Sequence, residues 1–548
     1  MNTRTAALTE HAWWLRTYRW SWLRPDLIAG LTTAAVVIPQ AMAYPAIAGL
    51  PVEVGLYTAA VPMIAYALAG TSRPLSLSVT SSIGAVTGAA IVTAPDPRLA
   101  ATTLAFYCAV FLIIAWVLQL GYVADLISAP VLTGFKIGIG ITIAVGQFDS
   151  LLGVNIDNDH VVTQLWSAIT SISRSNGATL TLSLGCIAML LVIKRWLPRV
   201  PGPIIVVALT ILATWLWNLQ NYGIARIEPV PSGLPRPALP HFAGSLDLVV
   251  PALGVALIVF VESISAARAF QRAEDRRVSA DRELAALGLA NVVSSLLRGM
   301  PAGGGMSQTA VNDGAGARSP MAAVGAATTV ILTLLFLAPV FSYLPQATLG
   351  ALVFIAAIGL VDIRTLRRIL SVERRDGLLA ILAALGVIAT GALYGILGAV
   401  LISVLTLLFQ LSRRPVEIVT AVPAPGAAQI PIPPAILLVR PRSDIFFATV
   451  QHFHRDLYAA LAARDPKPTI VLIDASRLYL FEFTAHEAIR DLVADLRDQG
   501  LETWAVLPRG EAAEAVRRFR HVFGSGEAQL FPTVADAIEA HLDDQGAS

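Results

Sequence analysis

The chain repeats one pattern over most of its length, in which a long apolar run is followed by a short polar segment. A helix needs about 20 apolar residues to cross a bilayer. Windows of that kind predict fourteen crossings, near residues 26–46, 52–70, 77–95, 101–120, 123–146, 177–197, 201–218, 247–267, 283–298, 305–312, 319–341, 347–361, 377–391 and 394–411. The average of about 28 residues per crossing leaves little length for loops, so the pattern predicts a compact α-helical multi-pass membrane protein.

Two of these runs, the third and the tenth, are too short and too polar to cross as simple helices. The third opens with LSLSVTSS (75–82) and the tenth with GGGMSQT (303–309). They take corresponding places in two sets of seven, and such paired interruptions are typical of an inverted-repeat transporter with its binding site near the bilayer midplane. The alternative is that the Gly and Ser residues serve only close helix packing, and it stays open at this point.

The pattern changes after residue 414. Residues 415–434 are rich in Pro, Ala and Gly and predict a linker. Strand-like runs at 435–439, 470–473 and 503–506 then alternate with helical stretches at 450–464, 485–499, 512–519 and 533–542. We therefore expect an N-terminal segment (1–25), a transmembrane domain (26–414), the linker, a small α/β domain (435–543) and a tail (544–548).

Composition narrows the class of protein. Only 14% of the residues are charged, against roughly 25% in soluble domains. The net charge of +2 and the lack of a basic run interleaved with aromatics argue against a nucleic-acid partner. Cys108 and Cys186 lie in apolar stretches, and no metal-ligand spacing, ATPase motif or catalytic constellation occurs. We expect no metal site, no cofactor and no enzymatic activity.

The positive charges predict the orientation in the cell membrane. Of the 27 Lys and Arg residues in 1–414, 21 lie in alternate connections on the side of the N-terminus and four on the other side. Cytoplasmic loops are the ones that carry such an excess. Both termini, and with them the C-terminal domain, are therefore expected in the cytoplasm.

Several local motifs resemble the sulfate permease (SulP) family of anion transporters. The resemblance rests on DLIAGL (26–31), IPQAMAY (38–44), GLP (49–51) with GLY (55–57), and APVLTGF (129–135). It implies fourteen spans in a seven-plus-seven inverted repeat, with a core domain (spans 1–4 and 8–11) and a gate domain (spans 5–7 and 12–14) that move as an elevator, usually in homodimers. VLIDAS (471–476) and FEFTA (481–485) resemble the STAS domain, for which a regulatory, partner-binding role and a role in dimer assembly and trafficking are both open.

The function that this resemblance implies is secondary active transport of an inorganic oxyanion, sulfate first. Bicarbonate and small dicarboxylates are the alternative substrates. An anion exchanger or channel, or a membrane-tethered sensor, are the alternative activities.

The candidate anion site lies where two half-helices face each other. Their N-termini, expected near Ser78 and Ser307, would present unpaired N–H groups and positive dipole ends to an anion. The candidate substrate-binding residues are Gln40, Ser78, Met306, Ser307, Gln308 and Thr309. The alternative for the hydroxyls is back-bonding within their own helices. Many family members carry an Arg where this chain has Gln308, so a positive charge is missing there.

Glu262 is the candidate ion-coupling residue, because it lies in an otherwise uncharged stretch of a span. In sodium-coupled family members a hydroxyl follows four residues later, and this chain has Ala266 there, which disfavours sodium. A carboxyl in a low-dielectric pocket takes up a proton more readily, so proton symport through Glu262 is the hypothesis. The alternative is a structural acid, paired with Lys136 or hydrogen-bonded within the core.

Overall fold

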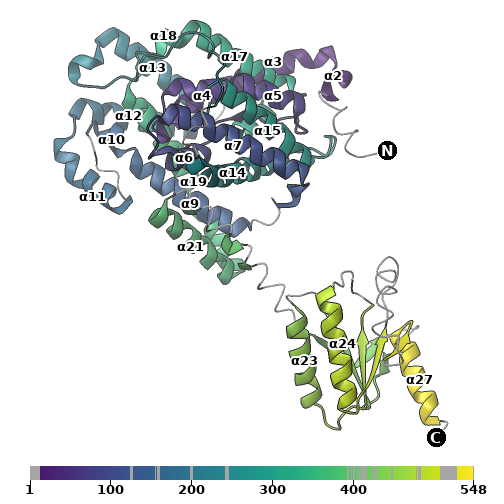
Figure 1. Ribbon diagram of the computed structural model, residues 1–548. Coiled ribbons are helices and arrows are strands. Elements are labelled where there is room, and N and C mark those ends of the chain that lie inside the picture. Colours follow the sequence, from purple (N-terminus) through teal and green to yellow (C-terminus); the bar gives the residue numbers. More distant parts are fainter. Residues whose placement is uncertain are drawn as a thin grey trace. The chain divides into compact units, whose positions relative to one another are not determined.

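The computed structural model describes residues 13–123, 128–154, 156, 161–197, 201–240, 246–391, 394–395, 398, 401–403, 405–406, 409, 416–423, 429–442, 444–445, 449–476, 478, 483–506 and 528–546. The chain divides into two compact units, Met1–Ser403 and Val404–Ser548, which are described separately (Figure 1).

The first unit is a bundle of helices in two sets that follow the predicted order. The first set is α2 Trp13–Thr17, η1 Trp20–Trp22, α3 Leu23–Ile47, α4 Val52–Ala59, α5 Val61–Ala69, β1 Leu77–Ser78, α6 Ser81–Ile91, α7 Pro97–Val117, η2 Leu120–Tyr122, α9 Ala129–Gly146, α10 Phe148–Leu152, α11 Val161–Ser171, η3 Ile172–Arg174, α12 Gly177–Trp196, α13 Gly202–Trp217 and η4 Leu219–Tyr222. The second set is η5 Leu246–Leu248, α14 Val249–Ala269, α15 Ala280–Leu296, β2 Gly303–Gly304, α16 Met306–Gly314, α17 Met321–Leu332, η6 Thr333–Leu337, α18 Ala338–Phe341, α19 Gln346–Leu360, α20 Ile363–Val372 and α21 Arg374–Thr390.

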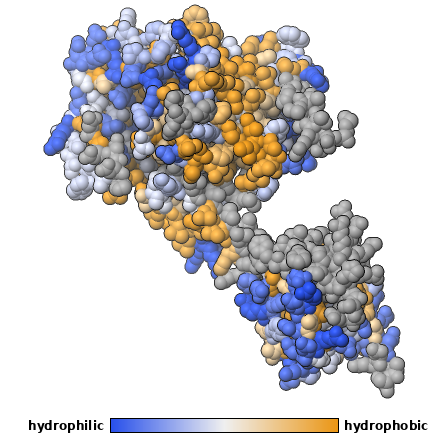
Figure 2. Space-filling view, viewed as in Figure 1, coloured by the Kyte–Doolittle hydropathy of each residue, from blue (hydrophilic) through white to orange (hydrophobic). Residues whose placement is uncertain are grey.

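Each of the first thirteen predicted crossings corresponds to a helix in these sets, while 394–411 lies mostly outside the described residues. The second crossing is divided between α4 and α5, because Pro62 cannot continue a helix through the preceding turn. Within the described residues, eight helical segments are long and apolar enough to span a membrane. Figure 2 shows hydrophobic residues over a broad area of this unit, as a lipid-facing surface requires.

The packing of this unit brings distant parts of the chain together. Helix α17 lies against α3, α15 against α7, and α21 against α9. We call α3–α7 with α14–α18 the core set, and α9–α13 with α19–α21 the gate set. The short helices α6 and α16 occupy matching positions in the two halves, where the sequence predicted interrupted spans.

The second unit is a five-stranded sheet covered by helices. Its strands are β3 Glu417–Val419, β6 Ile436–Arg440, β7 Ile470–Asp474, β8 Glu502–Val506 and β9 Ala528–Phe531, in the order β3-β6-β7-β8-β9. Strand β3 is antiparallel to β6, and the other pairs are parallel. A separate hairpin joins β4 Ala421–Pro423 and β5 Gln429–Pro431.

Alternating side chains of the central strands face two layers of helices. Leu437, Val439 and Val471 pack with α23 (Val450–Ala462) and α24 (Phe483–Asp498), whereas Leu438 and Leu472 pack with α27 (Val534–Gly546). Three strands and three helices match the prediction, and the predicted helix at 512–519 lies outside the described residues. Strands β3, β4 and β5 lie within 415–434, the stretch for which the sequence predicted a linker. The Pro and Gly content of this stretch predicted a linker, but β3 forms a strand there because its main chain pairs with β6.

Candidate functional site

Two short strands bring the half-helices of the two repeats to one place. Leu77 and Ser78 of β1 pair antiparallel with Gly304 and Gly303 of β2. The glycines allow this approach, because a Cβ on Gly304 would lie 2.7 Å from a Leu75 methyl carbon. Helix α6 then begins at Ser81 and α16 at Met306. The N-termini of both half-helices therefore start directly beyond the strand pair.

Thr80 is the N-cap of α6, and it also contacts Glu262, the acid within α14. Its Oγ1 accepts a hydrogen bond from the backbone N of Ile83 at 3.2 Å and lies 2.9 Å from Oε2 of Glu262 on α14. The sequence placed the start of this half-helix near Ser78, which is too early because the β1 pairing takes up that residue. Threonine ahead of Ser81 and Ser82 is a strong N-cap signal, and it could have identified Thr80 as a site residue.

A cavity of about 640 Å³ lies at these helix ends. The core set contributes Thr80, Ser81, Ser82 and Ser265 together with Glu262 and the start of α16. The gate set contributes Lys136 from α9, Lys194 from α12, and apolar residues of α19. The cavity is thus a polar site closed on one side by a largely apolar wall that carries two lysines.

Most of the residues predicted for the anion site meet in this cavity. Its lining includes Gln40, Met306, Ser307 and Gln308, as well as Glu262. The amide Nε2 of Gln40 lies 3.4 Å from Oγ of Ser307 and donates to it, so α3 and α16 are linked at the site.

Two of the predicted residues do not line the cavity. Thr309 is buried, and its Oγ1 accepts a hydrogen bond from the backbone N of Ser76 at 3.3 Å. Ser78 is also buried, and its hydroxyl has no hydrogen-bond partner within the described residues. Ser78 belongs to the strand pair and Thr309 to the contact of α16 with the segment before β1.

The charges around the cavity were only partly foreseen. Lys194 and Asp362 line it. Both lie at helix ends, where the sequence indicates only the side of the membrane and gives no sign of a binding site. Glu262 forms no ion pair with Lys136 among the described residues, and its partner is the hydroxyl of Thr80. The lysines of the site therefore stand on the gate set together with Asp362, while the core set carries Glu262.

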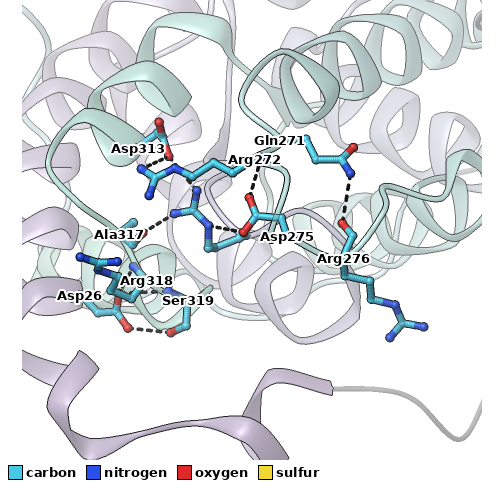
Figure 3. Close-up of polar contacts among 10 residues, drawn as sticks. Asp26, Gln271, Arg272, Asp275, Arg276, Asp313, Ala317, Arg318 and Ser319 are labelled. Carbon is cyan, nitrogen blue, oxygen red and sulfur yellow. Dashed lines mark hydrogen bonds and ion pairs between the residues drawn. The ribbon is translucent and has the colours of Figure 1, made fainter.

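The far end of α16 is held by a network of charged groups (Figure 3). Arg73, which is 8% exposed, bonds Asp275 through Nε at 2.9 Å and Asp313 through Nη2 at 2.8 Å. Arg272 bonds the same oxygen of Asp313 at 2.9 Å. Arg73 also donates to the carbonyl of Ala317. Since Asp313 lies in the last turn of α16, where the helix dipole disfavours an acid, the two arginines offset its charge.

A second set of bonds ties α16 along its length to the segment before β1. Asn312 donates to the carbonyl of Pro74 at 2.9 Å and accepts from Thr33 of α3 at 3.2 Å. Gly305 donates through its backbone N to the carbonyl of Ser76. Both half-helices are thus parts of one hydrogen-bonded unit within the core set.

Comparison with known proteins identifies the family. The model of the sulfate permease family matches residues 23–383, and that of the STAS domain matches residues 427–537. The chain belongs to the sulfate permease family. A probable sulfate transporter of Mycobacterium tuberculosis (strain CDC 1551) is 32% identical over 96% of both chains. The sodium-independent sulfate anion transporter of Bos taurus is 28% identical over 89% of this chain and 84% of its own.

Solved structures share the fold. Murine Solute Carrier 26 family member A9, an anion transporter described in the inward-facing state, matches with a TM-score of 0.88 at 21% identity, over 98% of this chain and 94% of that one. The transmembrane domain of the cyanobacterial bicarbonate transporter BicA matches with a TM-score of 0.60 at 21% identity, over 71% and 98%. This sulfate permease family member therefore has the helical multi-pass fold with a C-terminal STAS domain, consistent with the seven-plus-seven repeat.

Proposed function

We propose that this sulfate permease family member transports an inorganic oxyanion, sulfate first, across the cell membrane by secondary active transport. The observation that carries the proposal is the meeting of the N-termini of α6 and α16 at one cavity, beside the side chains of Gln40, Ser307 and Gln308. Amide, hydroxyl and backbone N–H donors bind oxyanions without a buried positive charge. The names of the mycobacterial and bovine relatives support sulfate as the first substrate to test.

Lysines of the gate set take the place of the positive charge that is missing at Gln308. Lys136 and Lys194 line the same cavity and attract an anion toward the neutral donors of the core set. The lysines belong to the gate set and the neutral donors to the core set. When the core set moves with its bound anion, the anion would therefore separate from the lysines. This arrangement supports an elevator movement of the core set against the gate set.

Proton coupling follows from the pair of Glu262 and Thr80. An ionised Glu262 accepts the one hydroxyl hydrogen of Thr80 and repels an anion in the cavity. A protonated Glu262 can donate to Thr80 instead, and the Thr80 hydroxyl is then free to donate to the anion. Proton and oxyanion therefore bind together, and sodium is not required.

The remaining parts of the proposal concern access and assembly. Lys194 and Asp362 lie at helix ends that the charge distribution assigns to the cytoplasm, so the cavity is accessible from that side, with both termini in the cytoplasm. We propose a homodimer in the lipid bilayer. The STAS domain would act in regulation, through a cytoplasmic partner.

The test is uptake of labelled sulfate into proteoliposomes under an inward proton gradient, a sodium gradient or neither. We expect concentrative uptake with the proton gradient alone, and competition by unlabelled sulfate. If bicarbonate or a small dicarboxylate competes more strongly than unlabelled sulfate, that anion replaces sulfate as the assigned substrate. Uptake that never exceeds equilibrium under a proton gradient would indicate a channel or exchanger, and absence of flux for all of these anions would overturn transport in favour of a sensor.

A further inference from the structure

Helix α20, Ile363–Val372, has two faces of opposite character. Ile363, Leu366 and Leu370 follow one another at helical spacing on one face, and Arg364, Arg367 and Arg368 lie on the other. No residue of α20 is buried; on its apolar face Ile363 is 42% exposed, and Leu366 and Leu370 are partly exposed. The helix is therefore amphipathic, and neither of its faces is fully covered by the rest of the unit.

Helix α20 is separate from the spanning helix before it. Helix α19 ends at Leu360, and Val361 has a non-helical backbone with φ −82° and ψ 81°. Asp362 then caps α20, accepting hydrogen bonds from Thr365 N at 3.0 Å and Thr365 Oγ1 at 2.6 Å. A new helix with its own cap thus starts at the end of span 12, on the side assigned to the cytoplasm.

The arginines of this region are only partly neutralised by the protein, since Asp362 interacts electrostatically with Arg364. Arg374 and Arg375 follow α20 directly, which makes five arginines within twelve residues. Within the described part of the chain, none of these five guanidinium groups forms an ion pair with a carboxylate, in contrast to Arg73 and Arg272. The carboxyl of Glu373 between them accepts from the backbone N of Arg375 at 3.4 Å and caps α21. Most of the positive charge of this surface is therefore available to another partner.

We propose that α20 binds anionic phospholipid of the cytoplasmic leaflet. Its guanidinium groups match lipid phosphate oxygens in charge and geometry, and its exposed apolar residues fit the boundary between headgroups and acyl chains. A soluble phosphate would use the first feature and leave the second exposed. An anionic leaflet uses both, which is why it is the partner that the surface fits.

Bound lipid at α20 acts on the transport cavity through the start of the helix. Asp362 caps α20 and also lines the cavity, as do Gly359 and Leu360 at the end of α19. A leaflet that holds α20 in place therefore holds one wall of the cavity mouth. This regulatory step rests on the proposed transport function, whereas the binding of lipid does not.

The binding test uses full-length protein in nanodiscs of phosphatidylcholine with an increasing fraction of phosphatidylglycerol, followed by native mass spectrometry of the retained lipid. We expect the wild type to retain phosphatidylglycerol selectively, and R364Q/R367Q/R368Q to retain it roughly tenfold less or lower still. R364K/R367K/R368K keeps the charge and is expected to keep most of the binding. R16Q/R19Q/R24Q removes the same charge from the N-terminal part of the cytoplasmic side, and it serves as the matched control.

The transport arm measures initial sulfate uptake in the same lipid mixtures. We expect uptake to depend on phosphatidylglycerol in the wild type and in the lysine variant, and to lose that dependence in R364Q/R367Q/R368Q. Equal lipid loss in R16Q/R19Q/R24Q, or lipid retention unchanged in the α20 glutamine variant, would overturn the proposal. Selective lipid retention by a protein that moves no anion would overturn transport and still support lipid binding at α20.

Discussion

The hydroxyl of Thr80 connects the N-terminus of α6 to the acid of α14: its Oγ1 lies 2.9 Å from Oε2 of Glu262 while it accepts a hydrogen bond from Ile83 N. The hydroxyl has only one hydrogen to donate. An ionised Glu262 takes that hydrogen, and a protonated one releases it toward the cavity. In the proton coupling that we propose, this hydrogen bond links Glu262 to the end of the half-helix where an anion would bind.

Thr80→Val tests this link. The change removes the N-cap, which costs about 1 kcal/mol of stability, together with the partner of Glu262. We expect KM for sulfate to rise roughly tenfold and the pH dependence of uptake to flatten. Thr80→Ser keeps both hydrogen bonds and is the matched control, with near-wild-type kinetics. A Thr80→Val protein with wild-type KM and pH profile would refute the role of the hydroxyl.

Glu262→Gln tests the coupling itself. The amide keeps the size of the side chain and its contact with Thr80 but cannot take up a proton. We expect uptake driven by a proton gradient to be lost while the protein folds normally, and the remaining downhill flux to become independent of pH. Uptake across a pH series and thermal unfolding of the same preparation check the two parts. Unchanged proton-driven accumulation would show that the proton uses another route.

Arg73→Gln tests the network behind α16. The change removes the buried guanidinium group that pairs with both Asp275 and Asp313. Breaking a buried ion pair in this way lowers the free energy of unfolding by about 3–5 kcal/mol. Arg272→Gln is the matched control, because Arg272 is 36% exposed and Asp313 keeps Arg73, so a loss of about 1 kcal/mol or less is expected. The measurement is thermal unfolding in detergent. Equal destabilisation by both variants would contradict the assignment of Arg73 as the central residue.

The order of the helices and the region of the site could be predicted from the sequence, since long apolar runs and two interrupted spans are local signals, whereas the orientation drawn from the arginine asymmetry stays a prediction. Gln40, Ser307, Gln308 and Glu262 were found in this way and meet at one cavity. The start of α6 was placed too early because the pairing of β1 with β2 joins residues more than two hundred positions apart. Lys194 could not be assigned to the cavity for the same reason, since its place there depends on how α12 packs against α19, which is distant in sequence.

The sequence motifs also contain glycines that are explained only by the packing of the helices. Gly134→Ala tests one of them. A Cβ on Gly134 would lie 1.9 Å from the carbonyl oxygen of Ala380 on α21, so α9 and α21 must separate. We expect a loss of about 3 kcal/mol in stability and a lower yield of folded protein. Gly185→Ala is the matched control, since a Cβ there has no atom within 4 Å. A normal yield of Gly134→Ala would show that the two helices adjust.

The STAS domain offers a pH test that is independent of transport. Burial lowers the pKa of His454 on α23 below its usual value of 6.5, although Asp491 and Asp495 nearby favour the charged form. The unfolded chain therefore binds a proton at a higher pH than the folded domain does. The stability contributed by the neutral imidazole is complete above the unfolded pKa of about 6.5 and is lost as the pH falls toward the folded pKa.

Hydrogen exchange of α23 and α24 in the intact protein, measured over that pH range, should show faster opening at the acidic end. His454→Gln replaces the imidazole by a side chain that does not titrate, so the acid-induced part of the opening should disappear. The buried Nε2 of His454 has no hydrogen-bond partner among the described residues, so burial of this atom outweighs the backbone of Ala488 and the carboxylates of Asp491 and Asp495, which favour the charged ring. The same acid sensitivity in His454→Gln would assign it to the carboxylates of Asp491 and Asp495 instead.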